Sequence, residues 1–182
     1  AIRYFGDGFK VSKKINDKKI WRIPVMEGEF VIEDKTSITN GIGGGNILII
    51  GDSNQEVLKS AEAAVKEMRK VNNIILPFPG GIVRSGSKVG SKYKSLIAST
   101  NDAYCPTLKG ITKTKLSKNN ESVLEIVIDG TNEKDISLAM KKGINIICKK
   151  FNKGIRSISA GNYGGKLGPY HFHLRDIMKW VI

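Results

Sequence analysis

Residues 46–71 read NILIIGDSNQEVLKSAEAAVKEMRKV and contain the two elements that decide the fold, a strand and a helix. Asn46 to Ile50 has the aliphatic, partly β-branched composition of a buried strand. Ser53 and Glu56 then show the Ser-x-x-Glu spacing of a capping box, which predicts a helix start. The helix expected after this cap has one apolar stripe, composed of Val57, Leu58, Ala61, Ala64, Val65, Met68 and Val71.

The same order of elements recurs later in the chain. A strand is predicted from Val123 to Ile128, followed by a cap at Thr131 or Asn132 and a helix ending near Lys149. The stripe of this helix consists of Ile136, Ala139, Met140, Gly143, Ile144, Ile147 and Cys148, so Cys148 is expected in the core.

An overlay that matches Asn54 with Asn132 indicates an internal duplication. Further strands are predicted at Ile74 to Leu76 and at Ile155 to Ala160, which complete two βαβ units. The resulting βαββαβ order predicts the α+β class, with a ferredoxin-like sandwich whose two helices cover one face of an antiparallel sheet.

We expect residues 1–45 to form lead-in strands and a glycine-rich connection, and residues 46–182 to form the ferredoxin-like lobe. The lead-in contains a predicted strand pair between Ile20 and Glu33, where apolar residues alternate with polar ones. Within the lobe, residues 77–120 form a long insertion. Compact domains rarely contain so long a connection without using it, so function is expected there.

Composition excludes several classes of protein. The 182 residues include no apolar run long enough to cross a bilayer, so a membrane protein is not expected. Cys105 and Cys148 lack the spacing of zinc or redox motifs, which predicts reduced thiols and a cytoplasmic location. Gly41 to Gly45 precedes a strand instead of linking a strand to a helix, which argues against a dinucleotide-binding loop.

The net charge of +13 results from 30 Lys and Arg against 17 Asp and Glu. These basic residues are spread along the chain, as on a solvated surface, although anionic partners are compatible with such a charge. RNA-binding modules of this fold need aromatic side chains on their strands, and the strands here are aliphatic. Only the positive charge therefore favours nucleic acid as a partner, and we do not expect it to be one.

Glu125 interrupts the apolar strand at the position that Ile47 has in the first half of the overlay. Two readings stay open. A buried glutamate would have its pKa raised by desolvation, which suits a group that holds or relays a proton. Alternatively, Glu125 faces water on the polar side of the sheet while Leu124 and Ile126 point inward.

Three other motifs also have two readings. One motif is the segment STNDAYCPT at residues 99–107, and another is the glycine pair, which occurs at Gly80-Gly81 and at Gly164-Gly165. Their polar side chains and backbone N–H groups could bind a ligand. Alternatively, these groups form hydrogen bonds within the turns to which they belong. His171 and His173 would lie on one side of a strand, as in a metal site. No third ligand has a suitable spacing, so no metal is expected.

Six segments together resemble formylmethanofuran:tetrahydromethanopterin formyltransferases. They are FGDGF at 5–9, WRIPVMEGEFVIED at 21–34, PFPGGIV at 77–83, SKVGSK at 87–92, STNDAYCPT at 99–107 and SAGNYGGKLG at 159–168. Members of this family are longer than 182 residues and have two lobes of ferredoxin-like topology. The resemblance implies that the chain corresponds to the C-terminal lobe with its lead-in strands, without the N-terminal lobe.

The resemblance further implies formyl transfer from N-formylmethanofuran to N5 of tetrahydromethanopterin, in a ternary complex and through a tetrahedral intermediate. It implies a homo-oligomer, dimer or tetramer, that uses these small C1 carriers as substrates, with no metal and no tightly bound cofactor. Glu125 matches the catalytic glutamate. The substrate-binding residues expected are Gly80, Gly81, Ser87, Lys88, Ser99, Thr100, Asn101, Asp102, Tyr104, Asn162 and Lys166.

Two other functions stay open. The chain could be a non-catalytic or incomplete lobe that serves as a subunit of a formyltransferase/hydrolase complex, or a basic nucleic-acid-binding module of ferredoxin-like fold.

Overall fold

A computed structural model describes residues 8–84, 88–162 and 169–179 of the chain. The chain divides into two compact units, Ala1–Asn40 and Gly41–Ile182.

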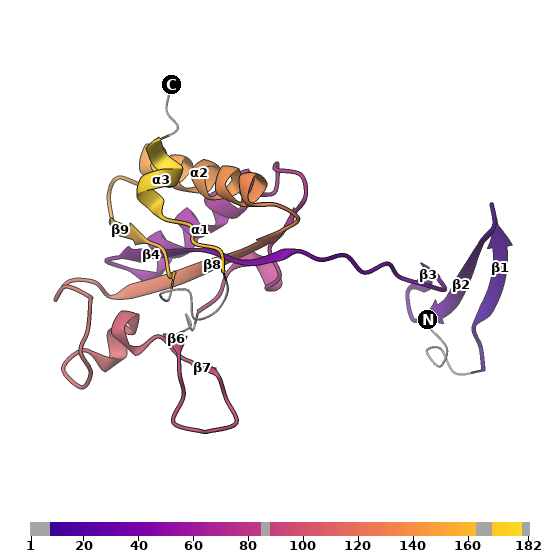
Figure 1. The fold of residues 1–182 in the computed structure, drawn as a ribbon, viewed down its shortest axis with the longest axis horizontal. Helices are drawn as coiled ribbons and strands as arrows, with labels where there is room; N and C mark the ends of the chain where they lie inside the picture. Colours follow the sequence, from indigo (N-terminus) through magenta and orange to yellow (C-terminus); the bar gives the residue numbers. More distant parts are fainter. Residues whose placement is uncertain (1–7, 85–87, 163–168, 180–182) are drawn as a thin grey trace. The chain divides into compact units, whose positions relative to one another are not determined.

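The first unit contains a three-stranded antiparallel sheet of β1 (Val11–Ile15), β2 (Lys18–Val25) and β3 (Gly28–Glu33), in that order (Figure 1). Asn16 and Asp17 both have positive φ, as required in the two-residue turn that joins β1 to β2. The predicted strand pair corresponds to β2 and β3. It omitted β1, because the sequence VSKKI is too rich in lysine to show an apolar pattern.

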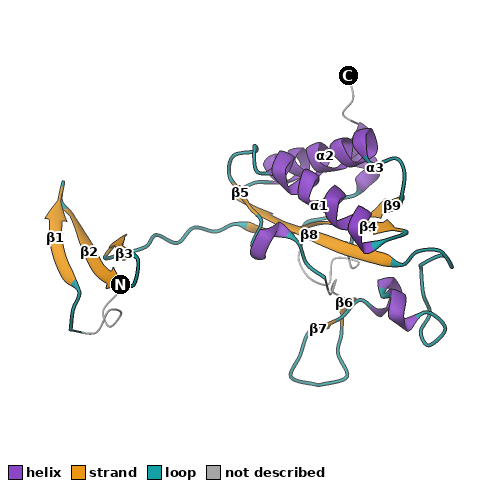
Figure 2. Ribbon diagram, turned by 180° about the vertical axis from the view of Figure 1, so that it is seen from behind, coloured by secondary structure: helices purple, strands orange, loops and turns teal. Residues whose placement is uncertain are grey.

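The second unit contains a four-stranded antiparallel sheet in the order β5-β8-β4-β9. Its strands are β4 (Ile42–Gly51), β5 (Ile74–Ile75), β8 (Ser122–Gly130) and β9 (Ile155–Ser159). The helices α1 (Asn54–Met68) and α2 (Glu133–Lys150) lie together on one side of this sheet (Figure 2). Mixed helices and an antiparallel sheet confirm the α+β class.

The core of this unit follows a repeat of 79 residues, the spacing between the helix caps Ser53 and Asn132. At this spacing, all six buried residues of α1 match the six of α2. The pairs are Val57 and Ile136, Ser60 and Ala139, Ala61 and Met140, Ala64 and Gly143, Val65 and Ile144, and Met68 and Ile147.

Two parts of the predicted stripes are therefore wrong. Leu58 is exposed, and so is Cys148, which was expected in the core. Both residues lie one position beyond the stripe that packs on the sheet. The overlay of Asn54 on Asn132 was also wrong by one residue, because the helix cap in the first half is Ser53.

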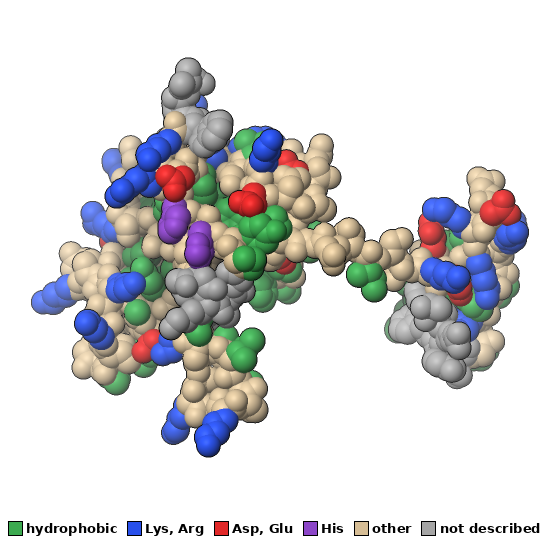
Figure 3. Space-filling model, in the orientation of Figure 1, with side chains coloured by type: hydrophobic (Ala, Val, Ile, Leu, Met, Phe, Trp, Pro, Cys, Tyr) green, Lys and Arg blue, Asp and Glu red, His purple; other side chains and the backbone are tan. Residues whose placement is uncertain are grey.

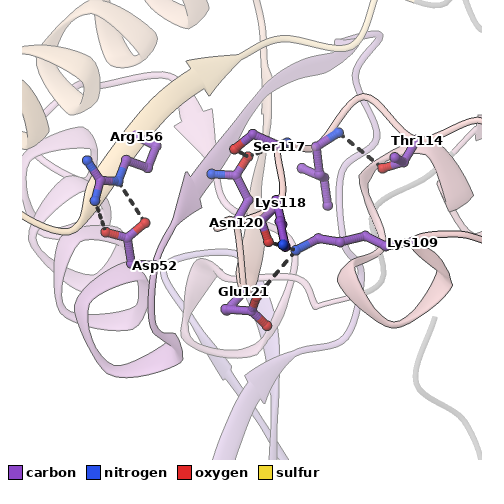
Figure 4. Close-up of polar contacts among 9 residues, drawn as sticks. Asp52, Lys109, Thr114, Ser117, Lys118, Asn120, Glu121 and Arg156 are labelled. Carbon is purple, nitrogen blue, oxygen red and sulfur yellow. Dashed lines mark hydrogen bonds and ion pairs between the residues drawn. The ribbon is translucent and has the colours of Figure 1, made fainter.

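The part of the insertion from Lys88 onward lies on the side of the sheet opposite the helices (Figures 1 and 2), whereas its first turn, η1, contacts α1. It contains three short 3₁₀ turns and one small hairpin. These elements are η1 (Pro79–Gly81), β6 (Lys88–Val89), β7 (Ala98–Ser99), η2 (Asp102–Tyr104) and η3 (Pro106–Leu108). The later part of the insertion is tied to the start of β8 by Lys109, whose Nζ lies 3.0 Å from the carbonyl oxygen of Lys118 and 3.4 Å from Glu121 (Figure 4).

The C-terminal segment differs from its prediction. His171 and His173 are not in a strand and instead precede the short helix α3 (Leu174–Lys179), which the sequence analysis did not predict. An ion pair between Asp52 and Arg156 fastens β9 beside the start of α1 (Figure 4). Within the described residues, no helix has the length and apolar character needed to span a membrane.

Candidate active site

Glu125 lies in the middle of β8, with Leu48 of β4 on one side and Val83 on the other. Its backbone exchanges two hydrogen bonds with Val83, of 2.7 and 2.9 Å. Leu124 and Ile126 belong to the core beneath the helices, so strand alternation directs the Glu125 side chain to the opposite face. Only 1% of the residue is exposed, and the solvent-facing reading of Glu125 is therefore wrong.

The two carboxylate oxygens of Glu125 have different surroundings. Oε1 accepts a hydrogen bond of 2.8 Å from the side-chain amide of Asn46. Oε2 is buried and has no hydrogen-bond partner among the described residues. Burial raises the pKa of the Glu125 carboxyl, and the Asn46 hydrogen bond opposes this rise. The arrangement suits a group that takes up and releases a proton.

Asn46 is the residue that sequence reasoning missed. It lies on β4 and is 5% exposed, and its Oδ1 accepts the backbone N–H of Gly161 at 2.7 Å. The sequence contains a signal for it, because the 79-residue repeat matches Asn46, not Ile47, with Glu125. The two polar residues thus occupy equivalent positions of the two halves.

A row of paired residues crosses the sheet through Glu125. Ser159 of β9 pairs with Leu48, which pairs with Glu125, which pairs with Val83. Directly paired residues face the same side, and neighbouring strands lie about 4.8 Å apart, so Ser159 and Glu125 are separated by roughly 10 Å on one face. The Tyr104 hydroxyl lies 3.4 Å from the Ser159 hydroxyl, which brings the insertion to this face.

A second group of predicted residues meets inside the insertion. Lys88 of β6 pairs with Ser99 of β7, and its ammonium forms a 2.6 Å ion pair with Asp102. The hydrogen bond from Lys88 holds the pKa of the Asp102 carboxyl below its usual value. The backbone N–H of Asp102 donates to the carbonyl of Thr100 at 2.9 Å. The carbonyl of Asn101, which is 7% exposed, accepts the N–H of Tyr104.

The Gly80-Gly81 pair lies in η1, shortly before Val83 in the chain, and both glycines have positive φ. The N–H of Gly81 donates to the carbonyl of Phe78 at 2.7 Å, and a Cβ at this residue would press on Val65. Gly81 therefore has a packing role. Apart from its two chain neighbours, no described residue has an atom within 4 Å of the place where a Cβ on Gly80 would be, so this position is open.

Asn162 also has a structural role, because its side chain both accepts the N–H of Phe172 at 2.7 Å and donates to the carbonyl of Phe172 at 3.3 Å. These bonds hold the segment after β9 against the segment before α3. Ser87, Lys166 and the pair Gly164-Gly165, which were also predicted at the site, lie outside the described residues.

His171 and His173 line a separate cavity of about 640 Å³ beside α2 and α3, which does not include Glu125. Their ring centroids are 5.8 Å apart. No group of three or more His, Cys, Asp and Glu side chains in the described part of the chain is arranged to hold a metal ion.

A buried carboxylate with a raised pKa, on a sheet face approached by a polar insertion, is typical of sites for general acid–base chemistry. The family model "FTR, proximal lobe" matches residues 28–177 of this chain. The chain belongs to this family of formyltransferases, as the resemblance implied.

Two curated relatives indicate how closely the chain matches. It is 62% identical to formylmethanofuran–tetrahydromethanopterin formyltransferase of Methylobacillus flagellatus over 178 residues, covering 97% of this chain and 59% of the relative. The enzyme of the same name from Methanocaldococcus jannaschii is 45% identical over 182 residues, with 98% of this chain and 60% of the relative covered. The chain thus spans about three fifths of the length of these relatives.

Two solved structures are similar in fold. The formyltransferase from Methanosarcina barkeri gives a TM-score of 0.75 at 44% identity, covering 96% of this chain and 59% of that one. A chain of the formyltransferase/hydrolase complex from Methylorubrum extorquens, solved with methylofuran, gives 0.74 at 47% identity, covering 97% of this chain and 60% of that one.

Proposed function

We propose that the chain takes part in formyl transfer from N-formylmethanofuran to N5 of tetrahydromethanopterin. The names of the relatives support this reaction, and the observation that carries it is the buried Glu125 carboxyl, of which one oxygen accepts a hydrogen bond and the other has no partner among the described residues. The chain spans about three fifths of these relatives, so the activity is proposed for the protein at its full natural length.

The reaction is an acyl transfer between two nitrogens. N5 of the pterin attacks the formyl carbon and forms a new C–N bond, giving a tetrahedral intermediate with a negative oxygen. The C–N bond to methanofuran then breaks, and the oxygen again becomes a carbonyl. One proton leaves N5 and one proton is delivered to the departing amine, so the protons balance. A carboxyl with a raised pKa is able to relay this proton, which is the role assigned to Glu125.

The insertion supplies the remaining groups. We assign Ser99, Thr100 and Asn101, with Gly80, to the formyl oxygen, and Tyr104 to the substrate-facing row of the sheet. Lys88 is assigned to the anionic groups of the substrates, with Asp102 holding its ammonium in place. Charged hydrogen bonds of this kind orient substrates strongly. Tyr104 supports these assignments, because its hydroxyl lies 3.4 Å from that of Ser159 in the row of Glu125, and its 3₁₀ turn contains Asp102, the partner of Lys88.

The strand order β5-β8-β4-β9, the antiparallel pairings and the two helices on one face support a ferredoxin-like sandwich for the second unit. We further propose a cytoplasmic protein that acts as an oligomer. A relative from Methylorubrum extorquens, 47% identical over 186 residues, is named as one of the subunits of a formyltransferase/hydrolase complex. This name favours a second candidate, in which the chain belongs to a subunit of such a complex.

Transfer of an isotopically labelled formyl group tests the proposal. The full-length protein is mixed with labelled N-formylmethanofuran and unlabelled tetrahydromethanopterin, and both carriers are separated after a single turnover. We expect the label on N5 of the pterin. If both carriers bind and the label stays on methanofuran, the catalytic proposal is wrong and the protein is a binding subunit.

A further inference from the structure

We propose that Asn46 is a positioning residue that fixes the Glu125 carboxyl so that Oε2 alone exchanges the proton with the substrate nitrogens. This inference rests on the proposed function. It also makes a claim about the side-chain pair itself, which is testable without turnover.

The backbone holds the two residues in a fixed relation. Ile47 pairs directly with Ile126, its equivalent in the 79-residue repeat, so a local two-fold axis passes between these residues. Asn46 and Glu125 are the preceding residues of the two strands, and they meet diagonally across this axis on the face away from the helices. The central strands are the most constrained part of the sheet, so little movement of either backbone is expected.

The orientation of the Asn46 amide is determined by its partners. The backbone N–H of Gly161 is able only to donate, so the atom that it meets at 2.7 Å is the Asn46 oxygen. The atom that faces Glu125 at 2.8 Å is then the amide nitrogen, which is able only to donate. One carboxylate oxygen, Oε1, is consequently engaged as an acceptor, and turning the carboxyl out of this plane would leave the amide donor unsatisfied in a buried place.

This arrangement directs the proton to Oε2. As N5 bonds to the formyl carbon, Oε2 takes the proton from N5. As the bond between the formyl carbon and the methanofuran nitrogen breaks, Oε2 returns a proton to that nitrogen, and Glu125 ends in its starting state. Asn46 acts through Glu125 and does not contact the reacting atoms.

Among the described residues, Asn46 is the polar neighbour that affects the pKa of the Glu125 carboxyl. The flanking residues Leu48 and Val83 are uncharged, and so is Ser159 in the same row. Arg84, which follows Val83 in the chain, is a charged residue along that edge. Within the described residues, burial raises the pKa of Glu125 and the Asn46 amide is the group that lowers it.

Infrared titration of the Glu125 carboxyl tests the pair directly. The carboxylic C=O band is assigned by its loss in Glu125→Gln. In Asn46→Leu we expect the titration midpoint to move to higher pH, because the donor that stabilises the carboxylate is absent. Asn120→Ala is the control, since it removes a buried amide whose side-chain oxygen accepts from Ser117 in the described part of the chain, and it must leave the midpoint unchanged.

Asn46→Asp provides a variant of nearly the same shape that still accepts the Gly161 N–H. Two adjacent carboxyls share a proton, so we expect the band to titrate in two steps, with the upper step above the parent midpoint. An unmoved midpoint in both Asn46 variants would overturn the inference. A lower melting temperature with no shift would mean that Asn46 only stabilises the fold, which also contradicts it.

Measurement of kcat and KM for formyl transfer is the second test of the role of Asn46. We expect Asn46→Leu to lower kcat by up to about 100-fold with little change in KM, because the carboxyl loses its alignment. Unchanged kcat would contradict the positioning role. If instead Glu125→Gln itself keeps the parent turnover, the proposed function of Glu125 fails, while the infrared result still decides whether Asn46 controls its carboxyl.

Discussion

Burial of the Glu125 carboxylate lowers the stability of the fold in which it lies. Its neighbours along β8 are Leu124 and Ile126, and it is itself 1% exposed. A charged carboxylate in such a place needs several hydrogen bonds to replace water, yet the described residues supply one. A residue retained at such a cost is best explained by the proton chemistry proposed for it.

The unfavourable desolvation of ionised Glu125 predicts how the free energy of unfolding depends on pH. Because the pKa of Glu125 is raised in the folded protein, folding favours its protonated form. That contribution is fully present below the pKa of the unfolded state and is lost as pH rises through the folded pKa. Glu125→Gln removes the ionisation, so we expect its free energy of unfolding to exceed that of the parent increasingly as pH rises from acid to neutral.

Urea unfolding of both proteins across this pH range measures the difference. Glu62→Gln, at an exposed glutamate of α1, is the matched control and should show no such trend. A difference between Glu125→Gln and the parent that is the same at every pH would contradict a raised pKa.

At the scale of elements, the two halves share a glycine at the end of each central strand. Gly51 ends β4 and Gly130 ends β8, and the two are 79 residues apart, as the helix caps are. A Cβ on Gly51 would meet Val57, and a Cβ on Gly130 would meet Ile136, the equivalent residue of the second helix. These glycines allow each helix to start close against its strand.

We therefore expect Gly130→Ala to lower the free energy of unfolding by about 1–3 kcal/mol, as overpacking does in other cores. Its Cβ would lie 2.9 Å from Ile136 and 3.0 Å from the backbone oxygen of Asn73. Gly43→Ala is the control, because its Cβ would meet Asp129 at an ordinary 3.4 Å. Equal stability of the two variants in urea unfolding would contradict this account of the repeat.

Much of this architecture was predictable from local patterns. The capping box at Ser53 and the stripes of both helices are short-range signals, and the structure confirms them apart from Leu58 and Cys148. The short helix α3 and the lysine-rich strand β1 carry too little apolar pattern to be recognised. The repeat was recognised but aligned by residue identity at Asn54, which placed it one residue out of register.

The candidate site was predictable only in part. Glu125 was visible because it interrupts an apolar strand, and its burial could not be decided because strand periodicity does not say what covers a face. In the sequence, Asn46 is a polar residue at the start of a predicted strand. Its contact with Glu125 could not be predicted, because the two residues are 79 positions apart. The contact of Lys88 with Asp102 depends on the path of the insertion, which has no periodic pattern.

At the scale of the whole molecule, the net charge of +13 results from basic residues that are spread along the sequence. Figure 3 shows Lys and Arg side chains scattered over the visible face of the molecule. Such a surface is compatible with anionic substrates, because clustered or dispersed positive charge raises encounter rates with them. The site itself depends on a few residues, and Lys88 is the lysine among them whose partner is defined.

The chain spans about three fifths of the length of the relatives that it matches. The measurement that tests the central claim most directly is kcat for formyl transfer by Glu125→Gln, with Glu62→Gln, at an exposed glutamate of α1, as control. We predict a loss of about 100-fold or more for Glu125→Gln, the usual contribution of a general acid–base group, with the control unchanged. Turnover by Glu125→Gln equal to that of the parent would contradict the account.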